Sequence, residues 1–264
     1  MSFQEAHTLE EHRDYLYQIV HLHLFFAHFW LEKHPEETFS SVLRNRVDIY
    51  RKTNVNPEML NPRELYFDCE PWRTLERAAE DVYRRYKDDR AAFEEEAFQV
   101  FKGSIDARCE RDYLDTSALA GYQCGSLRHE NALSIDGATV VFHIANAVSP
   151  KSIFTDPGYL PDCFRKLLDA AERMGAVRIG TRSWLNDNPK WQVLFPREWM
   201  ENMRERNKDV QWHYGFWGQF ISARHTYNKK YGDYMRATGE FPFYPRYACC
   251  TIESMRKKLD GEEV

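Results

Sequence analysis

The stretch that decides the fold is ATVVFHIAN, residues 138–146, which is typical of a β-strand. Its β-branched residues favour an extended backbone. Asp156 and Pro157 follow as the N-cap and first residue of a helix that we expect to end at Gly175. A second strand is predicted over residues 176–184. Strand and helix therefore alternate in this part of the chain, which indicates a sheet with flanking helices.

The chain before this stretch is predicted to be helical. Thr8 and Glu11 have the spacing of a capping box, which begins a helix that we expect to reach about Lys33. A second helical stretch is predicted over residues 36–53. A long helix is predicted over residues 71–103, because apolar residues recur there at helical spacing and a glycine stands at its end.

These predictions place the chain in the α+β class. We expect a helical region, residues 1–115, packed on a mixed β-sheet domain with flanking helices, residues 116–264. Helical patterns over residues 189–206 and 226–238 supply the flanking helices. At 264 residues the chain is long enough for one large domain or two small ones.

Composition limits the class of protein and its partners. Charged residues make up 29% and hydrophobic residues 43%, as in ordinary globular proteins. The net charge of −5 argues against nucleic acid as a partner, because phosphate-backbone binding needs a basic surface. The apolar run at residues 15–31 is too short and too polar to span a bilayer, so we expect no membrane partner. The aromatic content of 15% favours a thick core, an aromatic pocket or a homo-oligomer interface.

The six cysteines show no CxxC spacing, so neither a zinc knuckle nor a thioredoxin-type redox pair is indicated. The N-terminus is acidic and polar, which does not predict a signal peptide. We therefore expect free thiols and a cytoplasmic location. Cys249 and Cys250 are the candidates for redox activity if they are exposed.

The stretch VQWHYGFWGQFISARHTYN, residues 210–228, is the main candidate for a ligand site. If residues 210–222 form a strand, alternate side chains point to opposite faces. One face then carries an imidazole, a gap, an indole and an amide: His213, Gly215, Trp217 and Gln219. We predict that this face lines a pocket for a small-molecule ligand, with the glycine leaving room for it. Arg224 is a candidate anion-binding residue near a helix start, and a solvated loop is the alternative.

The first helix carries a polar stripe on an otherwise apolar surface. Its titratable members are Asp14, His21, His28 and Glu32. Imidazole and carboxylate ligands at helical spacing can converge on a metal, which would fit a metal-dependent oxygenase or hydrolase. The alternative is that the stripe faces water. The predicted helix at residues 71–103 contains no histidine, so it offers no matching imidazole ligands.

Polar residues also stand on or near the two predicted strands. His143 is a candidate general base, and the alternative is a core histidine that makes one hydrogen bond. Asn146 ends its strand, where ligands of open α/β sheets bind. Ser183 and Trp184 end the second strand and are candidate substrate-binding residues, with a structural role as the alternative for the tryptophan.

Residues 138–240 resemble the C-terminal half of GNAT-like acyltransferases at the level of pattern. The matching pieces are His143-Ile144, helix 157–174, Ser183-Trp184-Leu185, Leu194-Phe195-Pro196 and Gln219-Phe220. The resemblance implies acyl transfer from acyl-CoA. The pyrophosphate-binding turn R/Q-x-x-G-x-G/A of working acetyltransferases has no match in this chain.

The resulting lead hypothesis is a cytoplasmic small-molecule enzyme that transfers an acyl group. His143 or His213 would be the general base that deprotonates an amine, because imidazole titrates near working pH. Two rival hypotheses remain. One is the metal-dependent enzyme that uses the polar stripe, and the other is a non-catalytic binding or assembly protein with an aromatic interface.

Overall fold

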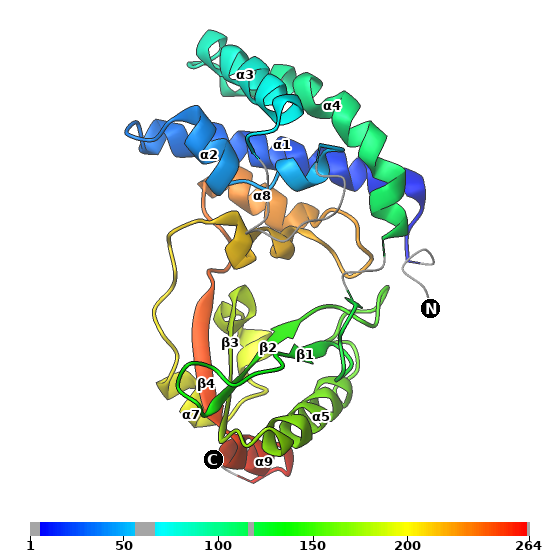
Figure 1. Ribbon diagram of the computed structural model, residues 1–264, viewed down its shortest axis with the longest axis vertical. Helices are drawn as coiled ribbons and strands as arrows, with labels where there is room; N and C mark the ends of the chain where they lie inside the picture. The colour runs from blue at the N-terminus through cyan, green and yellow to red at the C-terminus, as the bar shows by residue number, and fades with distance from the viewer. Residues whose placement is uncertain (1–5, 56–66, 116–118, 263–264) are drawn as a thin grey trace. The chain divides into compact units, whose positions relative to one another are not determined.

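The computed structural model describes residues 6–55, 67–115 and 119–262, and the chain forms two compact units. The helical unit contains the described residues up to Asp115 together with Val210–Pro242. The sheet unit contains the described residues that follow Asp115 up to Asp209, together with the described residues from Phe243 on. The α+β class is confirmed, with an N-terminal helical region and a C-terminal sheet (Figure 1).

Two helices of 25 residues each, α1 (Leu9–Lys33) and α4 (Arg90–Leu114), pack together at the centre of the helical unit. Shorter helices pack around them. They are α2 (Phe39–Asn45), the 3-10 turn η2 (Tyr50–Lys52), α3 (Glu70–Arg85) and α8 (Lys229–Thr238). Figure 1 shows α3 alongside α4. The buried residues of α1 are mostly apolar, so burial of this face provides much of the driving force for folding of the unit.

Local signals set the ends of these helices. The Thr8 hydroxyl accepts from the Glu11 amide, and the Glu11 carboxylate accepts from the Thr8 amide, so the predicted capping box is confirmed. The single helix predicted over residues 71–103 is wrong, because the chain breaks between α3 and α4. Asp89 caps the second helix by accepting from the Ala92 amide, and that helix continues past the predicted end.

The sheet unit is built on four strands in the order β1-β2-β3-β4. They are β1 (Leu127–His129), β2 (Thr139–Ile144), β3 (Arg178–Ser183) and β4 (Arg246–Thr251). The β2 and β3 strands are parallel and are joined through α5 (Tyr159–Arg173), while the outer pairs are antiparallel, so the sheet is mixed. This confirms the strand–helix–strand order predicted from the ATVVFHIAN stretch. Short helices complete the unit: η5 (Trp184–Asp187), α6 (Pro189–Gln192), α7 (Arg197–Glu201) and α9 (Ile252–Leu259).

The two faces of this sheet differ in burial. One face is buried under α5 and its neighbours and carries the residues Val140, Phe142, Ile179, Thr181, Ala248 and Cys250. The opposite face carries the polar or only partly buried residues Val141, His143, Arg182, Tyr247 and Cys249. Strand alternation explains this difference.

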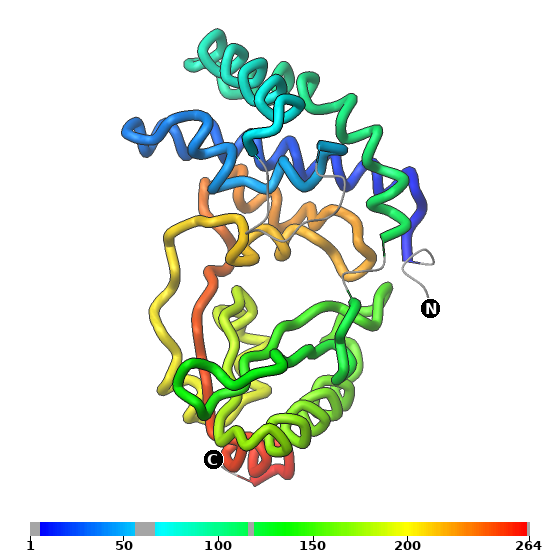
Figure 2. Tube along the Cα trace, in the orientation of Figure 1, coloured from blue at the N-terminus to red at the C-terminus, as the bar shows by residue number. Residues whose placement is uncertain are grey.

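The prediction of a strand over residues 210–222 is wrong. The segment forms two 3-10 turns, η6 (Trp212–Tyr214) and η7 (Phe216–Phe220), and it belongs to the helical unit. Gly215 between them has φ +78°, a left-handed conformation that suits glycine and breaks an extended chain. The sequence-based division had placed this segment with the sheet. In Figure 2 its gold-to-orange trace lies against the blue helices α1 and α2.

Contacts to α1 and α2 hold this segment. The two indole groups of Trp212 and Trp217 donate hydrogen bonds to the carbonyl oxygens of Arg44 and Arg46, at 2.9 and 3.0 Å. These carbonyls lie at the end of α2, where helical partners are lacking. The Arg46 guanidinium also donates to the Val210 carbonyl at 3.0 Å.

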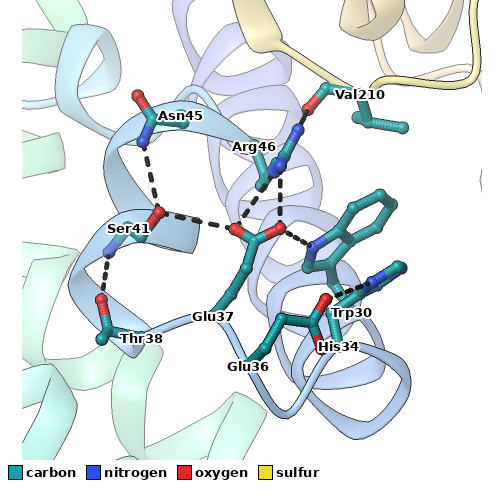
Figure 3. A network of polar contacts seen from close by, with 9 residues as sticks. All are labelled: Trp30, His34, Glu36, Glu37, Thr38, Ser41, Asn45, Arg46 and Val210. Atoms are coloured by element: carbon teal, nitrogen blue, oxygen red, sulfur yellow. Dashed lines mark hydrogen bonds and ion pairs between the residues drawn. The ribbon is translucent and has the colours of Figure 1, made fainter.

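Figure 3 shows how that arginine is fixed. Its guanidinium forms an ion pair with Glu37 at 2.8 Å and lies 4.9 Å from the centre of the Trp30 ring. The Trp30 indole donates to the same carboxylate at 2.9 Å. A charged pair with several hydrogen bonds therefore joins α1, α2 and the start of the 210–220 segment.

In the described part of the chain, no helix is both long and apolar enough to cross a membrane. All six cysteines lie in that part and none forms a disulfide bond. Cys109, Cys124, Cys163 and Cys250 are buried, and burial raises the pKa of the Cys250 thiol well above its usual range. That thiol is therefore unsuited to the redox role considered from the sequence.

Gly239→Ala is expected to lower the free energy of unfolding by about 3 kcal/mol. Gly239 ends α8 with φ +72°, and an added Cβ would lie 2.1 Å from the Phe29 ring. Gly175→Ala is the matched control, because Gly175 has φ +77° and nothing within 4 Å of an added Cβ. In the control, only the strain of a side chain at positive φ should lower the free energy of unfolding, by about 1 kcal/mol. Equal losses in urea titrations of the two variants would contradict the predicted steric contact.

Candidate functional site

The residues predicted to share a pocket face lie in different surroundings. His213 and Gly215 are exposed, whereas Trp217 and Gln219 are buried. The Gln219 amide donates to the Phe216 carbonyl at 2.9 Å and so stabilises its own turn. The shared face is therefore wrong, because a left-handed glycine between two 3-10 turns removes the alternation on which it depended.

The candidates on the first strand lie near the surface of the sheet unit. His143 pairs with the Glu130 carboxylate, and its side chain is 42% exposed. The Asn146 amide donates to the Lys151 carbonyl at 2.9 Å, and its oxygen accepts from the Val148 amide at 3.2 Å. Asn146 thus stabilises its loop. A catalytic role for His143 stays a prediction.

Ser183 and Trp184 have structural partners in the same unit. The Ser183 hydroxyl accepts from the Leu185 amide at 3.1 Å and caps η5. The Trp184 ring stacks on Phe243 with 6.0 Å between ring centres. These contacts account for both residues without a ligand, so their substrate-binding role also stays a prediction.

Arg224 lies in the helical unit beside the start of α1. Its guanidinium donates to the Ala6 carbonyl at 3.3 Å and lies 3.7 Å from the Glu11 carboxylate. A carboxylate of the protein therefore already lies beside this cation, and its anion-binding role stays a prediction. The next residue, His225, has φ +61°, which is uncommon for a residue with a side chain.

The polar stripe of α1 does not form one site. Asp14 is exposed. His21 contacts Glu94 at 3.2 Å, and the fully buried His28 lies 3.3 Å from Glu32. Among the described residues, no group of three or more histidine, cysteine or acidic side chains is placed to hold a metal ion. The stripe is also not uniformly exposed, so the water-facing alternative fails at His28.

A different face of α1 carries the site that the sequence did not reveal. His12 and His7 are both buried, and Nε2 of His7 lies 3.0 Å from Nδ1 of His12. On its other side, Nε2 of His12 lies 3.0 Å from Oδ2 of Asp112 on α4. A carboxylate only accepts, so His12 donates to Asp112 and accepts from His7. The result is a chain Asp112–His12–His7 with defined donors and acceptors.

Electrostatics keeps Asp112 ionised. Burial opposes the charged form, but the hydrogen bond from His12 and the charges of Lys52 and Arg108 outweigh burial. Together they lower the pKa of Asp112 to about 2. Asp112 therefore remains an anion at neutral pH and holds the His12 ring in one tautomer.

Lys52, at the end of η2, approaches the same chain. Its ammonium lies 5.9 Å from the centre of the Tyr15 ring, which is itself 5.9 Å from the His12 ring. Burial alone would favour the neutral amine, but Tyr15, Asp48 and Asp112 outweigh it and raise the pKa of Lys52. A cation therefore lies beside the imidazole–carboxylate chain. We call these five residues, His7, His12, Tyr15, Lys52 and Asp112, the His12 cluster.

Two further histidines border the His12 cluster. His225 stacks on His7 with 5.9 Å between ring centres, and burial and the charges of His7 and His12 lower its pKa to about 4. His23 is fully buried and contacts the Trp217 ring edge-on at 4.1 Å. Neither ring nitrogen of His23 has a hydrogen-bond partner among the described residues. Trp217 therefore contacts His23 from a 3-10 turn and not from the predicted strand.

One sequence signal could have pointed to this face. On a helical wheel His12, Tyr15 and His23 follow the buried rows of α1, where apolar residues are expected. The partners Lys52 and Asp112 come from distant parts of the chain, and no local pattern marks them.

Comparisons with protein-family models, with curated proteins and with solved structures found no match for this chain.

Proposed function

We propose that the protein is an enzyme acting on a small molecule, with His12 and His7 as its acid–base pair. The observation that carries this proposal is the buried chain Asp112–His12–His7. Buried histidines that are oriented by a carboxylate are a recurring form of general base. A proton accepted by either imidazole would be shared across the 3.0 Å contact between them, with Asp112 as the counter-ion.

Acyl transfer is the reaction class that we propose for this pair. The base would take a proton from an amine or hydroxyl nucleophile, and the nucleophile would attack the carbonyl carbon of an ester or thioester. The bond to the leaving group would then break, and the leaving group would receive the proton from the imidazolium. The positive charge of Lys52 would favour the negative charge that develops on the carbonyl oxygen, which is often a large contribution to catalysis.

The sheet unit offers a second candidate base, since His143 is also paired with a carboxylate. Its greater exposure supports His12 instead, because water weakens the electrostatic effect of such a pair. A reducing cytoplasm is the proposed location, and the six unpaired cysteines support it.

Hydrolysis of p-nitrophenyl acetate tests the acid–base proposal, because water then serves as the nucleophile. We expect His12→Gln to slow this reaction by about 100-fold after subtraction of the background from free imidazole. His143→Gln is the matched control and should retain the wild-type rate. Asp112→Asn should lower the rate, because an amide does not stabilise the imidazolium as a carboxylate does.

Loss of the reaction in His143→Gln alone would move the base to the sheet unit. Unchanged rates in both histidine variants would overturn the enzyme proposal and favour a binding or assembly protein. Melting temperatures of all three variants separate a lost base from a lost fold.

A further inference from the structure

We propose that Lys52 and Tyr15 bind an oxyanion of the substrate, so that the substrate is a small-molecule carboxylate or phosphate. This inference rests on the proposed function, since it names the substrate class of the His12 cluster. It adds a binding role that can be measured without turnover.

The Lys52 ammonium is the group that would bind the anion. Among residues 6–55, 67–115 and 119–262, none accepts a hydrogen bond from it or forms an ion pair with it. Lys52 is nevertheless only partly exposed and is closely surrounded by protein atoms. A half-buried ammonium without a carboxylate partner in this part of the chain can pair with the anion of a ligand.

The carboxylates near Lys52 already have partners. Asp48 accepts two hydrogen bonds from the Arg51 guanidinium, at 2.7 and 2.5 Å. Asp112 accepts from His12 at 3.0 Å and lies 3.6 Å from Arg108. The two carboxylates whose charges act on Lys52 are therefore already paired with other groups. A bound monoanion would balance the charge of the Lys52 ammonium.

A second donor is supplied by Tyr15. Burial raises the pKa of its hydroxyl, so the group stays protonated and able to donate. Within the described part of the chain, its hydroxyl has no hydrogen-bond acceptor. His23 adds two buried ring nitrogens without hydrogen-bond partners in the described part of the chain, and burial together with the charge of Lys52 lowers its pKa. The two His23 nitrogens are unsatisfied buried polar atoms, which are expected where a ligand or ordered water binds.

A lysine–tyrosine pair between α4 and α1 has a contrasting arrangement and supplies the control. The Lys102 ammonium lies 5.2 Å from the centre of the Tyr17 ring, so its geometry resembles that of Lys52 over Tyr15. There, however, Asp106 forms an ion pair with Lys102 at 2.8 Å and also accepts from the Tyr17 hydroxyl. An internal carboxylate occupies the position that we assign to the ligand oxygen at Lys52.

The test is binding of inorganic phosphate and of acetate, each compared with chloride at equal ionic strength. We expect one of the two anions to raise the melting temperature of the wild type with a saturating dose response. Lys52→Met should weaken the apparent affinity by at least about tenfold, and Tyr15→Phe should weaken it to a smaller extent. Lys52→Arg retains the charge and should retain binding. Lys102→Met and Tyr17→Phe should respond as the wild type does.

The effective anion identifies the chemistry as phosphate or carboxylate. Equal responses of the wild type and Lys52→Met would overturn the proposal, because anions that act by exclusion stabilise every variant. Binding that is lost in Lys52→Met while ester hydrolysis is independent of His12 would remove the proposed function alone. Hydrolysis that depends on His12, with anion responses unaffected by Lys52, would remove only the oxyanion site.

Discussion

Acidification from pH 6.5 to pH 4 is expected to remove about 3 kcal/mol of stability through His23 alone. His23 is fully buried, and burial lowers its pKa to about 3. Asp48 opposes this shift, whereas Lys52 and Arg51 add to it. The unfolded chain takes up this proton near pH 6.5, so below that pH it binds one more proton than the folded chain. Stability therefore falls as the pH falls, until the folded pKa is reached.

Urea titrations at several pH values measure this effect. His23→Leu removes the titrating group from an apolar position. Between pH 6.5 and pH 4 this variant should therefore lose about 3 kcal/mol less unfolding free energy than the wild type. His129→Leu is the control, because His129 lies at the edge of the sheet and is not buried. His225 acts in the same direction as His23 and should account for part of the remaining slope. Parallel curves for the wild type and His23→Leu would show that His23 takes up its proton as readily in the folded chain as in the unfolded chain.

Trp217→Ala is expected to lower the free energy of unfolding by about 4 kcal/mol. Its ring contacts Phe26 and Phe241, at 5.4 and 5.2 Å between ring centres, and also the His23 ring. Its indole N–H donates to the Arg46 carbonyl at 3.0 Å. The substitution therefore creates a large cavity and leaves a carbonyl at the end of α2 without this donor.

Trp184→Ala is the matched control for this prediction. Trp184 is only partly buried and stacks on Phe243. Its replacement by alanine should therefore lower the free energy of unfolding by about 2 kcal/mol less than Trp217→Ala does. Trp217→Phe keeps most of the buried ring but loses the N–H, and we expect a loss of about 1–2 kcal/mol. Urea titrations measure all three variants. A loss in Trp217→Ala no larger than that in Trp184→Ala would contradict the contacts described for the 210–220 segment.

The parts of the fold that depend on residues close together in the sequence were predictable. The capping box of Thr8 and Glu11 begins α1 where expected, because both partners lie within one helical turn. The ATVVFHIAN stretch forms β2, and the following helix and strand form the parallel β2–α5–β3 unit. Side-chain periodicity and helix-end residues suffice for such elements, since they act over a few residues.

The candidate site was only partly foreseeable. The sequence predicted a histidine general base at His143 or His213, whereas we propose His12 for that role. The approach of Lys52 and Asp112 to His12 joins residues that are 40 and 100 positions apart from it along the chain. Neither partner follows a recognisable motif, so only the packing of α1 against α4 and η2 shows the cluster.

The sequence by itself determined the elements that short-range forces dictate: the long first helix, the strand–helix–strand order and the α+β class. Tertiary structure alone decided the 210–222 segment and the His12 cluster. Aromatic residues at alternate positions of this segment suit a strand. The left-handed Gly215 and the hydrogen bonds from two indole groups to the Arg44 and Arg46 carbonyls instead favour two 3-10 turns packed on α2. Those carbonyls lie more than 160 residues away in sequence, and bonds over such distances exist only once the helices have packed.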